Sequence, residues 1–339
     1  MCNKMIREYL KLSRSFNAVL TAISPVMGAI AMQEYDIVKL FLLFQIGFFG
    51  HTYGFVLNDI LDYNIDKSSK EISDRPLISG TISIKKAWIF AISSLIYALS
   101  IAFIISFITK NYLPIIFLIL SSIFITIYDF ISKKYPAMDI FVALGVFFII
   151  IYGASTAVDN LQISKLAIIV GILGSIQVLF MQFIAGGLKD IENDYKRGAN
   201  TLAVKLGVRI ANGKLRISAY FKALAYGLQI IDLAVVFLPF FIIWNFNDLT
   251  NMQYLQWIII TIIGLTMIFI SYRLLSMEKF ERKKARKLIG SHYMINFMIV
   301  PIMLMKLNPW AGLLMFFPLI GFIINNIVVH GTILQPKTM

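Results

Sequence analysis

Cysteine is nearly absent from this sequence. The only one is Cys2, which excludes an internal disulfide framework and a metal cluster held by cysteines. Charged residues are also scarce, at 14% of 339 residues, whereas a soluble domain has about a quarter. No Pro/Ser-rich linker or low-complexity tract divides the chain, so we predict a single membrane domain over residues 1–339. The period-2 alternation that a membrane β-barrel requires is missing as well.

Apolar residues make up 59% of the chain, and its mean hydropathy is +0.79. A helix needs about 20 largely apolar residues to span a bilayer, because the hydrocarbon core is about 30 Å thick. Such runs recur from end to end, which predicts an all-α, polytopic transmembrane helical bundle. The ninth run is short and contains Pro301, so nine and ten spans both fit the sequence. The predicted spans are 16–33, 38–57, 87–109, 113–131, 140–158, 166–188, 218–243, 253–275, 291–305 and 309–330.

Lysine and arginine are concentrated in alternate connections. The N-terminus and the connections after spans two, four, six and eight hold nearly all of them, and the opposite connections hold only Lys39, Lys110, Lys165 and Lys306. This asymmetry predicts a multi-pass protein of the cell membrane with a cytoplasmic N-terminus. The formal charge of +13 therefore follows from topology, and we expect no nucleic-acid partner. No small-residue cleavage site follows the first span, so we expect it to be retained.

Two carboxylate clusters follow spans two and six. In the first, Asp59, Asp62 and Asp66 have helical spacing i, i+3 and i+7 and share one face with Asn58 nearby. In the second, Asp190 and Asp194 are one turn apart. Like charges at this spacing repel and call for a compensating partner. Mg²⁺ fits, because it takes a few carboxylates together with waters and phosphate oxygens.

Basic residues surround both clusters, as a diphosphate ligand requires. Lys67, Lys70 and Arg75 follow the first cluster, and Lys196 and Arg197 follow the second. The alternative is that these are solvated loop charges. The regular spacing, the position at the membrane boundary and the duplication all count against it.

These residues resemble the signatures of the UbiA superfamily of intramembrane prenyltransferases. The first signature is Asn58-Asp59-x-x-Asp62-x-x-x-Asp66 followed by Asp74-Arg75-Pro76-Leu77-x-x-Gly80, and the second is Asp190-x-x-x-Asp194-x-x-x-Gly198-x-x-Thr201-Leu202. Tyr128 to Lys133 looks like the intervening Tyr/Lys element. The segment Arg14-Ser15-Phe16-Asn17 is similar to the Arg-Pro-x-Asn entry to the first helix, with Ser15 in place of proline. The resemblance covers about residues 11–305.

The resemblance implies nine helices around a cavity capped on the cytoplasmic side, with 309–330 as an additional C-terminal helix. It implies that Mg²⁺ and diphosphate bind Asn58, Asp62, Asp66, Asp190 and Asp194, and that the four aspartates are catalytic. The resemblance also implies that Asp59 supports these ligands and that Asn17 lies near the acceptor. The diphosphate would be contacted by Arg75, Tyr128, Lys133 and Lys67. Lys67 stands where many members have arginine, so bidentate phosphate binding is not expected there.

Two further polar residues lie within predicted spans. His51 is seven residues before Asn58 and on the same face. It contacts the acceptor or takes its proton, or, as we favour, it makes a structural hydrogen bond within its helix or to another helix. Asp232 lies near the middle of span seven, where an ionisable group is a candidate functional residue. Orientation of a polar acceptor and packing as a protonated acid are equally consistent with its position.

We therefore predict Mg²⁺-dependent transfer of a polyprenyl group from an allylic prenyl diphosphate to a membrane-associated acceptor, with the site toward the cytoplasm. The acceptor is hydrophobic or amphipathic, of the aromatic quinone-precursor or the prenylated glycerol phosphate type. No protein partner is indicated. The alternative function is a secondary transporter with carboxylate sites at the cytoplasmic face, but that class predicts charges at the membrane midplane, where only Asp232 lies.

Overall fold

The computed structural model describes residues 2–67, 72–132, 134–159, 162–197, 200–211, 214–244 and 250–332. Within these residues eight helices are long and apolar enough to cross a membrane, and two shorter apolar helices span Ser15–Ala31 and Ile140–Ser155. These segments correspond one to one to the predicted spans. The prediction of an all-α, multi-pass membrane protein is therefore confirmed. The chain divides into two compact units, which are described separately below.

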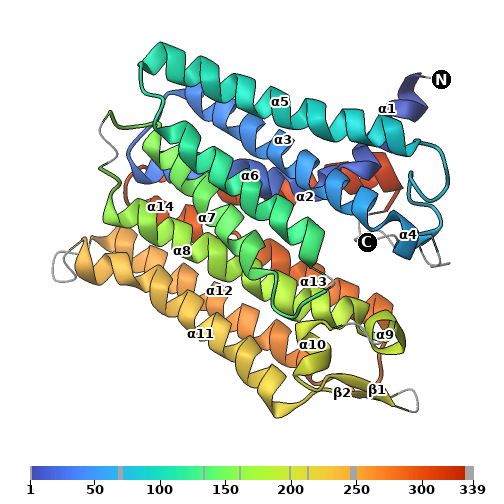
Figure 1. The fold of residues 1–339 in the computed structure, drawn as a ribbon. Coiled ribbons are helices and arrows are strands. Elements are labelled where there is room, and N and C mark those ends of the chain that lie inside the picture. Colours follow the sequence, from blue (N-terminus) through green and yellow to red (C-terminus); the bar gives the residue numbers. More distant parts are fainter. Residues whose placement is uncertain are drawn as a thin grey trace. The chain divides into compact units, whose positions relative to one another are not determined.

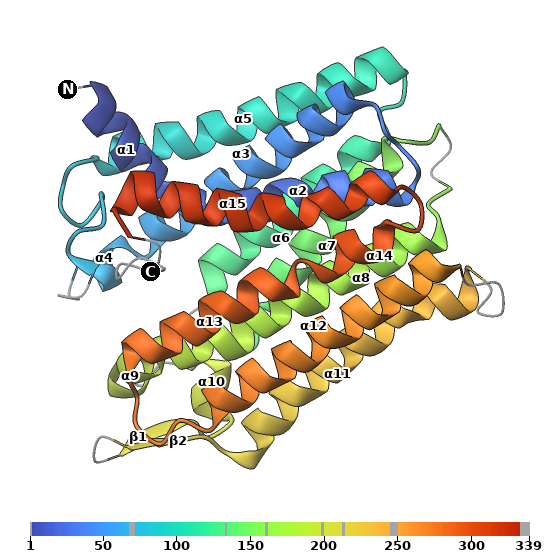
Figure 2. The ribbon, with the colours of Figure 1, turned by 180° about the vertical axis from the view of Figure 1, so that it is seen from behind.

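The first unit comprises Met1–Phe130, Phe148–Ile163 and Phe316–Met339. Helix α3 packs against both α2 and α5, and α15 packs against α2 (Figure 1; Figure 2). The last helix of the chain thus lies beside the first apolar one. The helices of this unit are α1 (Cys2–Leu12), α2 (Ser15–Ala31), α3 (Ile37–Leu61), α4 (Tyr63–Asp66), α5 (Ile84–Thr109), α6 (Pro114–Ile131, all but its last residue), the end of α7 (Ile140–Ser155), α15 (Phe316–Asn325) and the π-helix η5 (Asn326–His330).

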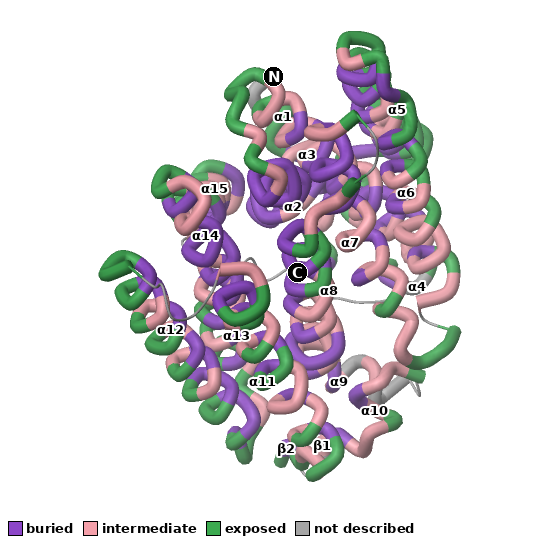
Figure 3. Tube along the Cα trace, turned by 90° about the vertical axis from the view of Figure 1, so that its left-hand side faces the viewer, coloured by how far each residue is buried: buried purple, intermediate pink, exposed green. Residues whose placement is uncertain are grey.

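Helix α5 has two different faces, as a helix at the lipid boundary should. Four alanines with helical spacing are buried against neighbouring helices, and bulky apolar residues on the other side are exposed (Figure 3). Small residues let membrane helices approach closely, whereas exposed isoleucine and phenylalanine are stable in lipid. The buried set is Ala87, Ala91, Ala98 and Ala102, and the exposed set includes Trp88, Ile92, Ile96, Phe103 and Phe107.

One apolar cluster of the first unit holds the segments that carry the first signature. Leu12 of α1, Val56 and Ile60 of α3, and Leu77 and Ile82 of the following loop are all buried together. The loop turns back at Gly80, whose φ of +73° is one that residues with a side chain rarely adopt. Burial of Leu77 and Ile82 thus fixes the loop, and Arg75 with it, against the end of α3.

The second unit comprises Ile131–Phe147 and Ser164–Met315. One of its apolar clusters includes Leu188 and Ile191 of α9, Ala203 of α10, Val208, and Leu215 of a two-stranded hairpin. The antiparallel strands pair Arg209 with Arg216, and the sequence analysis missed them. The remaining elements are α8 (Lys165–Leu179), the π-helix η2 (Phe180–Gly186), α9 (Gly187–Arg197), α10 (Leu202–Lys205), β1 (Arg209–Ala211), β2 (Lys214–Arg216), α11 (Ala219–Ile242), α12 (Asn251–Leu275), α13 (Arg282–Asn296), α14 (Ile299–Leu304) and the 3₁₀-helix η4 (Pro309–Met315).

The ninth span differs most from its prediction. Its helix begins at Arg282, in a basic run expected to be a connection, because lysine and arginine continue a helix well but carry no hydropathy signal. The helix is interrupted at residues 297–298 rather than at Pro301. Pro301 lies in the first turn of α14, where its missing N–H leaves no intrahelical hydrogen bond unmade. The sequence analysis also missed α1, which is polar on one face.

Candidate active site

The first signature lies where α3 ends. Asp59 is in the last turn of α3, Asp62 is its C-terminal cap, and Asp66 closes the short helix α4. The amide of Asp62 donates to the Asn58 carbonyl at 2.9 Å, and the amide of Asp66 donates to the Asp62 carbonyl at 2.9 Å. These i to i−4 bonds keep the predicted helical spacing although the helix is interrupted at Asp62. Asp59 and Asp66 are buried, at 6% and 9% exposure.

Two arginines compensate these carboxylates. Arg14 donates from Nη2 to Asp59 Oδ1 at 2.7 Å. Arg75 donates from Nη1 to Asp66 Oδ2 at 2.6 Å, and the same nitrogen lies 3.4 Å from Asp59 Oδ1. All four side chains are largely buried, and an unpaired charge there would carry a large desolvation penalty. Arg14 was quoted in the N-terminal motif but was not predicted as a site residue.

Asp129 is a second residue that the sequence analysis missed. It lies on α6 beside Tyr128, is 7% exposed, and accepts a hydrogen bond from Asn58 Nδ2 at 3.2 Å. This contact engages the amide nitrogen of Asn58 and leaves its amide oxygen as the atom suited to bind a cation. The sequence did contain a signal that could have identified Asp129: a carboxylate at the end of an apolar helix, next to a motif tyrosine.

The other predicted residues of the first unit lie at different depths. Tyr128 is half-buried on α6, and Lys67 is exposed, with its ammonium 5.9 Å from the ring centre of Tyr63. Asn17 is buried in α2, and its Oδ1 has no hydrogen-bond partner among the described residues. Lys133 lies outside the described residues, as does Lys70.

His51 makes a contact between helices. Its Nδ1 lies 2.9 Å from Thr21 Oγ1 of α2, and its ring packs on Phe55 with centroids 4.2 Å apart. This is the structural hydrogen bond favoured from the sequence. Its buried Nε2 has no partner within the described part of the chain.

The second signature lies on α9. Leu188 and Ile191 are completely buried on one side of this helix, while Asp190 and Asp194, one turn apart, are half-buried. Lys189 Nζ lies 3.5 Å from Asp190 Oδ2. The π-helix η2 leads directly into α9, and π segments inside helices occur frequently at functional sites. The side chains of Lys196 and Arg197 are not described.

Asp232 is buried within the second unit. It is 2% exposed on α11 and faces Gln177 of α8. One turn earlier, Gln229 donates to Ser271 Oγ at 2.6 Å and lies 2.6 Å from His292 Nε2. Polar side chains within membrane segments pair with one another in this way. The sequence analysis did not name His292, which lies in the second half of α13 and within the predicted ninth span.

The donor atoms present suit Mg²⁺ without forming a complete cage. Among the described residues, no group of three or more histidine, cysteine or acidic side chains is arranged to hold a metal ion. Mg²⁺ is usually bound through one or two carboxylates plus waters and substrate phosphates, so a preformed cage is not required. The carboxylates of Asp62 and Asp66 and the amide oxygen of Asn58 are hard oxygen donors of this kind. Each signature therefore supplies only part of the oxygen ligands that a bound Mg²⁺ would need.

Known proteins resemble this chain over most of its length. The model of the UbiA prenyltransferase family matches residues 18–299. The digeranylgeranylglyceryl phosphate synthase of Methanobrevibacter smithii is 25% identical over 293 residues, which are 86% of this chain and 96% of that protein. The synthase of the same name from Sulfolobus acidocaldarius is 30% identical over 207 residues, which are 60% of this chain and 70% of that protein.

Solved structures share the fold. A structure concerned with digeranylgeranylglyceryl phosphate synthase in membranes aligns with a TM-score of 0.62 at 22% identity, over 90% of this chain and 99% of that one. A UbiA homologue from Archaeoglobus fulgidus bound to DMAPP and Mg²⁺ aligns with a TM-score of 0.59 at 16% identity, over 86% of this chain and 99% of that one. The family model covers most of the chain, including both aspartate signatures. The chain therefore belongs to the UbiA prenyltransferase family.

Proposed function

We propose that this protein transfers a prenyl group from an allylic prenyl diphosphate to a prenylated glycerol phosphate, with Mg²⁺ as cofactor and diphosphate as product. The observation that carries the proposal is the first signature itself, a set of buried carboxylates tied by Arg75 at the end of a membrane helix. The acceptor class is supported by the relatives, which are named for a product that combines glyceryl phosphate with isoprenoid chains. An aromatic acceptor is the competing choice.

The chain's own residues would bind and orient the donor. Asp62 and Asp66 of the first signature and Asp190 and Asp194 of the second would hold the metal, with Asn58 as an amide ligand. Bound Mg²⁺ would stabilise negative charge on the departing diphosphate. Lys67, Arg75, Tyr128 and Lys133 would contact the diphosphate oxygens, and we propose that both signatures serve this one reaction.

The reaction breaks the bond between the allylic carbon and the diphosphate oxygen. Charge that develops on that oxygen is stabilised by cationic side chains, and water must be kept from the allylic carbon. The acceptor hydroxyl then forms a new carbon–oxygen bond, and its proton leaves with the diphosphate. Apolar membrane helices exclude water from such a step.

The proposed site faces the cytoplasm. This is supported by the basic residues, which are concentrated in the connections that carry both signatures. The cytoplasm is also where a water-soluble diphosphate product would be released.

The test is product formation by the purified protein in lipid nanodiscs. A prenyl diphosphate and a glycerol phosphate ether carrying one isoprenoid chain should yield the doubly prenylated ether, identified by mass spectrometry, together with one diphosphate per product. Excess EDTA should stop both, and restored Mg²⁺ should recover them. Undiminished turnover in EDTA would refute the metal dependence, and exclusive use of an aromatic acceptor would refute the acceptor class.

A further inference from the structure

The last helix of the chain lies beyond the 18–299 match to the family model, yet it is firmly attached to the N-terminal helices. Arg7 Nε donates to the Val329 carbonyl at 2.7 Å, and Ser15 Oγ donates to Asn325 Oδ1 at 3.0 Å. Phe16 packs edge-on against Phe322 at 5.7 Å between ring centroids. These contacts hold the end of η5 beside the junction of α1 and α2.

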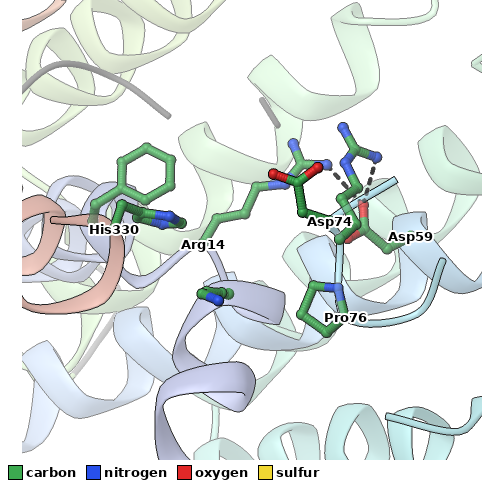
Figure 4. Close-up of a pocket in the computed structure, with 8 residues that line it drawn as sticks. Arg14, Asp59, Asp74, Pro76 and His330 are labelled. Atoms are coloured by element: carbon green, nitrogen blue, oxygen red, sulfur yellow. Dashed lines mark hydrogen bonds and ion pairs between the residues drawn. The ribbon is translucent and has the colours of Figure 1, made fainter. Parts of the chain in front are cut away.

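This attachment brings His330 into a pocket next to the first signature. The lining residues come from four separate segments, and Figure 4 shows the Arg14 side chain extending from beside His330 toward Asp59. The His330 ring packs edge-on against Phe16 at 5.9 Å between ring centroids. The residues that line the pocket are Lys11, Arg14, Phe16, Asp59, Asp74, Arg75, Pro76 and His330.

His330, which lines the pocket, carries a candidate donor for a ligand. Its Nε2 is buried and has no hydrogen-bond partner within the described residues. A buried polar atom without a partner is uncommon in native proteins, because its desolvation is costly unless water, an ion or a ligand bonds to it. As Nε2–H, it would donate to an oxyanion.

The lining of the pocket holds donors for an anion, although each of its cations also has a carboxylate partner. Lys11, Arg14 and Arg75 line it together with Asp59 and Asp74, and Arg14 pairs with Asp59 while Arg75 pairs with Asp66. Lys11 also pairs with Glu8 at 2.6 Å, and its flexible side chain can turn from that partner to a ligand. A guanidinium, an ammonium and an imidazole together match the tetrahedral oxygens of a phosphate monoester.

The backbone at Arg14 is consistent with a functional role. Arg14 precedes α2 with φ 47° and ψ 46°, a left-handed conformation that is unfavourable for a residue with a side chain. Its guanidinium lies 4.8 Å from the ring centre of Phe55 and reaches Asp59. Strained backbone of this kind clusters at ligand sites, where the surrounding structure maintains it.

We infer that this pocket binds the phosphate monoester of the acceptor and that His330, from the additional helix, selects phosphorylated acceptors. The inference rests on the proposed function for the identity of the acceptor. The pocket shares Asp59 and Arg75 with the first signature, so a phosphate held there lies beside the proposed diphosphate site. Arg14 and Lys11 supply the charge, and His330 supplies a directional hydrogen bond.

The test measures binding without the donor and without Mg²⁺. Protein in phosphatidylcholine nanodiscs is titrated with the mono-prenylated glycerol phosphate and with its dephosphorylated counterpart. His330→Ala should weaken binding of the phosphorylated ether about tenfold, as expected for loss of one charge-assisted hydrogen bond, and leave the dephosphorylated ether unaffected. His330→Gln keeps a donor and should restore most of the affinity. Lys284→Met, which removes an exposed cation of the second unit, is the matched control for charge.

Kinetics and a competing lipid separate the sources of phosphate. In turnover, His330→Ala should raise KM for the acceptor and leave KM for the prenyl diphosphate unchanged. An equal rise in KM for the donor would assign the pocket to the diphosphate and overturn the inference. Phosphatidic acid is the competing lipid. If it binds as tightly as the acceptor and with the same dependence on His330, the pocket is a general lipid site and the inference is overturned.

The two proposals can fail separately. Selective, His330-dependent binding of the phosphorylated ether by a protein that transfers no prenyl group would uphold the pocket and refute the proposed function. Normal prenyl transfer, with no effect of His330→Ala on acceptor binding, would uphold the proposed function and refute the pocket. If His330→Ala does not fold, two measurements still test the inference. One is the affinity of His330→Gln, which conserves size and polarity, and the other is the wild-type preference for the phosphorylated over the dephosphorylated ether.

Discussion

Arg75 Nη1 donates to Asp66 Oδ2 at 2.6 Å and lies 3.4 Å from Asp59 Oδ1, so one guanidinium joins two carboxylates of the first signature. Asp66 is a proposed metal ligand, and Arg75 is a proposed diphosphate contact. The same arginine therefore compensates both carboxylates, and we expect it to turn to the phosphate oxygens when a donor is bound.

Arg75→Gln should separate these two roles. Without the guanidinium, Asp66 is free to bind a cation, so Mn²⁺ measured by electron paramagnetic resonance should bind more tightly than in the wild type in the absence of donor. Diphosphate release should fall about a hundredfold, because roughly 3 kcal/mol of transition-state stabilisation is lost. Weaker Mn²⁺ binding in Arg75→Gln would show that the arginine does not compete with the metal.

Asp62→Asn and Asp190→Asn test whether the two signatures act together. Each substitution should reduce prenyl transfer about a hundredfold, and the double variant should lose clearly less than the product of the two, because residues acting as one unit are not additive. Rates are compared at matched protein levels and thermal stability, since relief of carboxylate repulsion can stabilise the unliganded protein. Strictly multiplicative losses would mean that the signatures work independently.

Gly153→Ala should destabilise the first unit. A Cβ at Gly153 would lie 1.9 Å from the Pro25 carbonyl oxygen, and one at Gly28 would lie 2.1 Å from the Ile150 carbonyl oxygen, so α2 and α7 approach closely there. Overpacking costs about 1–3 kcal/mol, which should lower the thermal unfolding midpoint by several degrees. Gly227→Ala is the control, because nothing lies within 4 Å of its added methyl group. An unchanged midpoint for Gly153→Ala would contradict this packing.

Reporter fusions test the topology. Phe16 near the start of α2 and His330 at the end of η5 are in contact. We therefore predict that the chain crosses the membrane an even number of times between them. Reporters before residue 15, after residue 80 and at the C-terminus should therefore all be cytoplasmic, and reporters after residues 36 and 163 should be on the opposite side. A C-terminus on the side opposite to the N-terminus would indicate nine spans and refute the ten-span arrangement.

The sequence by itself determined the environment, the helical fold and the spacing of the aspartates in both signatures. Apolar runs of spanning length leave few alternatives, because lipid accepts only helices or closed barrels. Aspartates with helical spacing kept that spacing in α3, α4 and α9, since local hydrogen bonds set it. Hydropathy placed the predicted spans within a few residues, except where Arg282 begins a helix with charged residues.

Only the tertiary structure decided which side chains compensate these carboxylates. Arg14, Arg75 and Asp129 reach Asp59, Asp66 and Asn58 from positions 9 to 71 residues away in sequence. His330 lines the same pocket as Arg14 because α15 packs on α2 and η5 packs on α1, at a separation that no local pattern encodes. The periodicity of one segment specifies which face its residues share, but not which other segment covers that face. That choice depends on the packing of all the helices together.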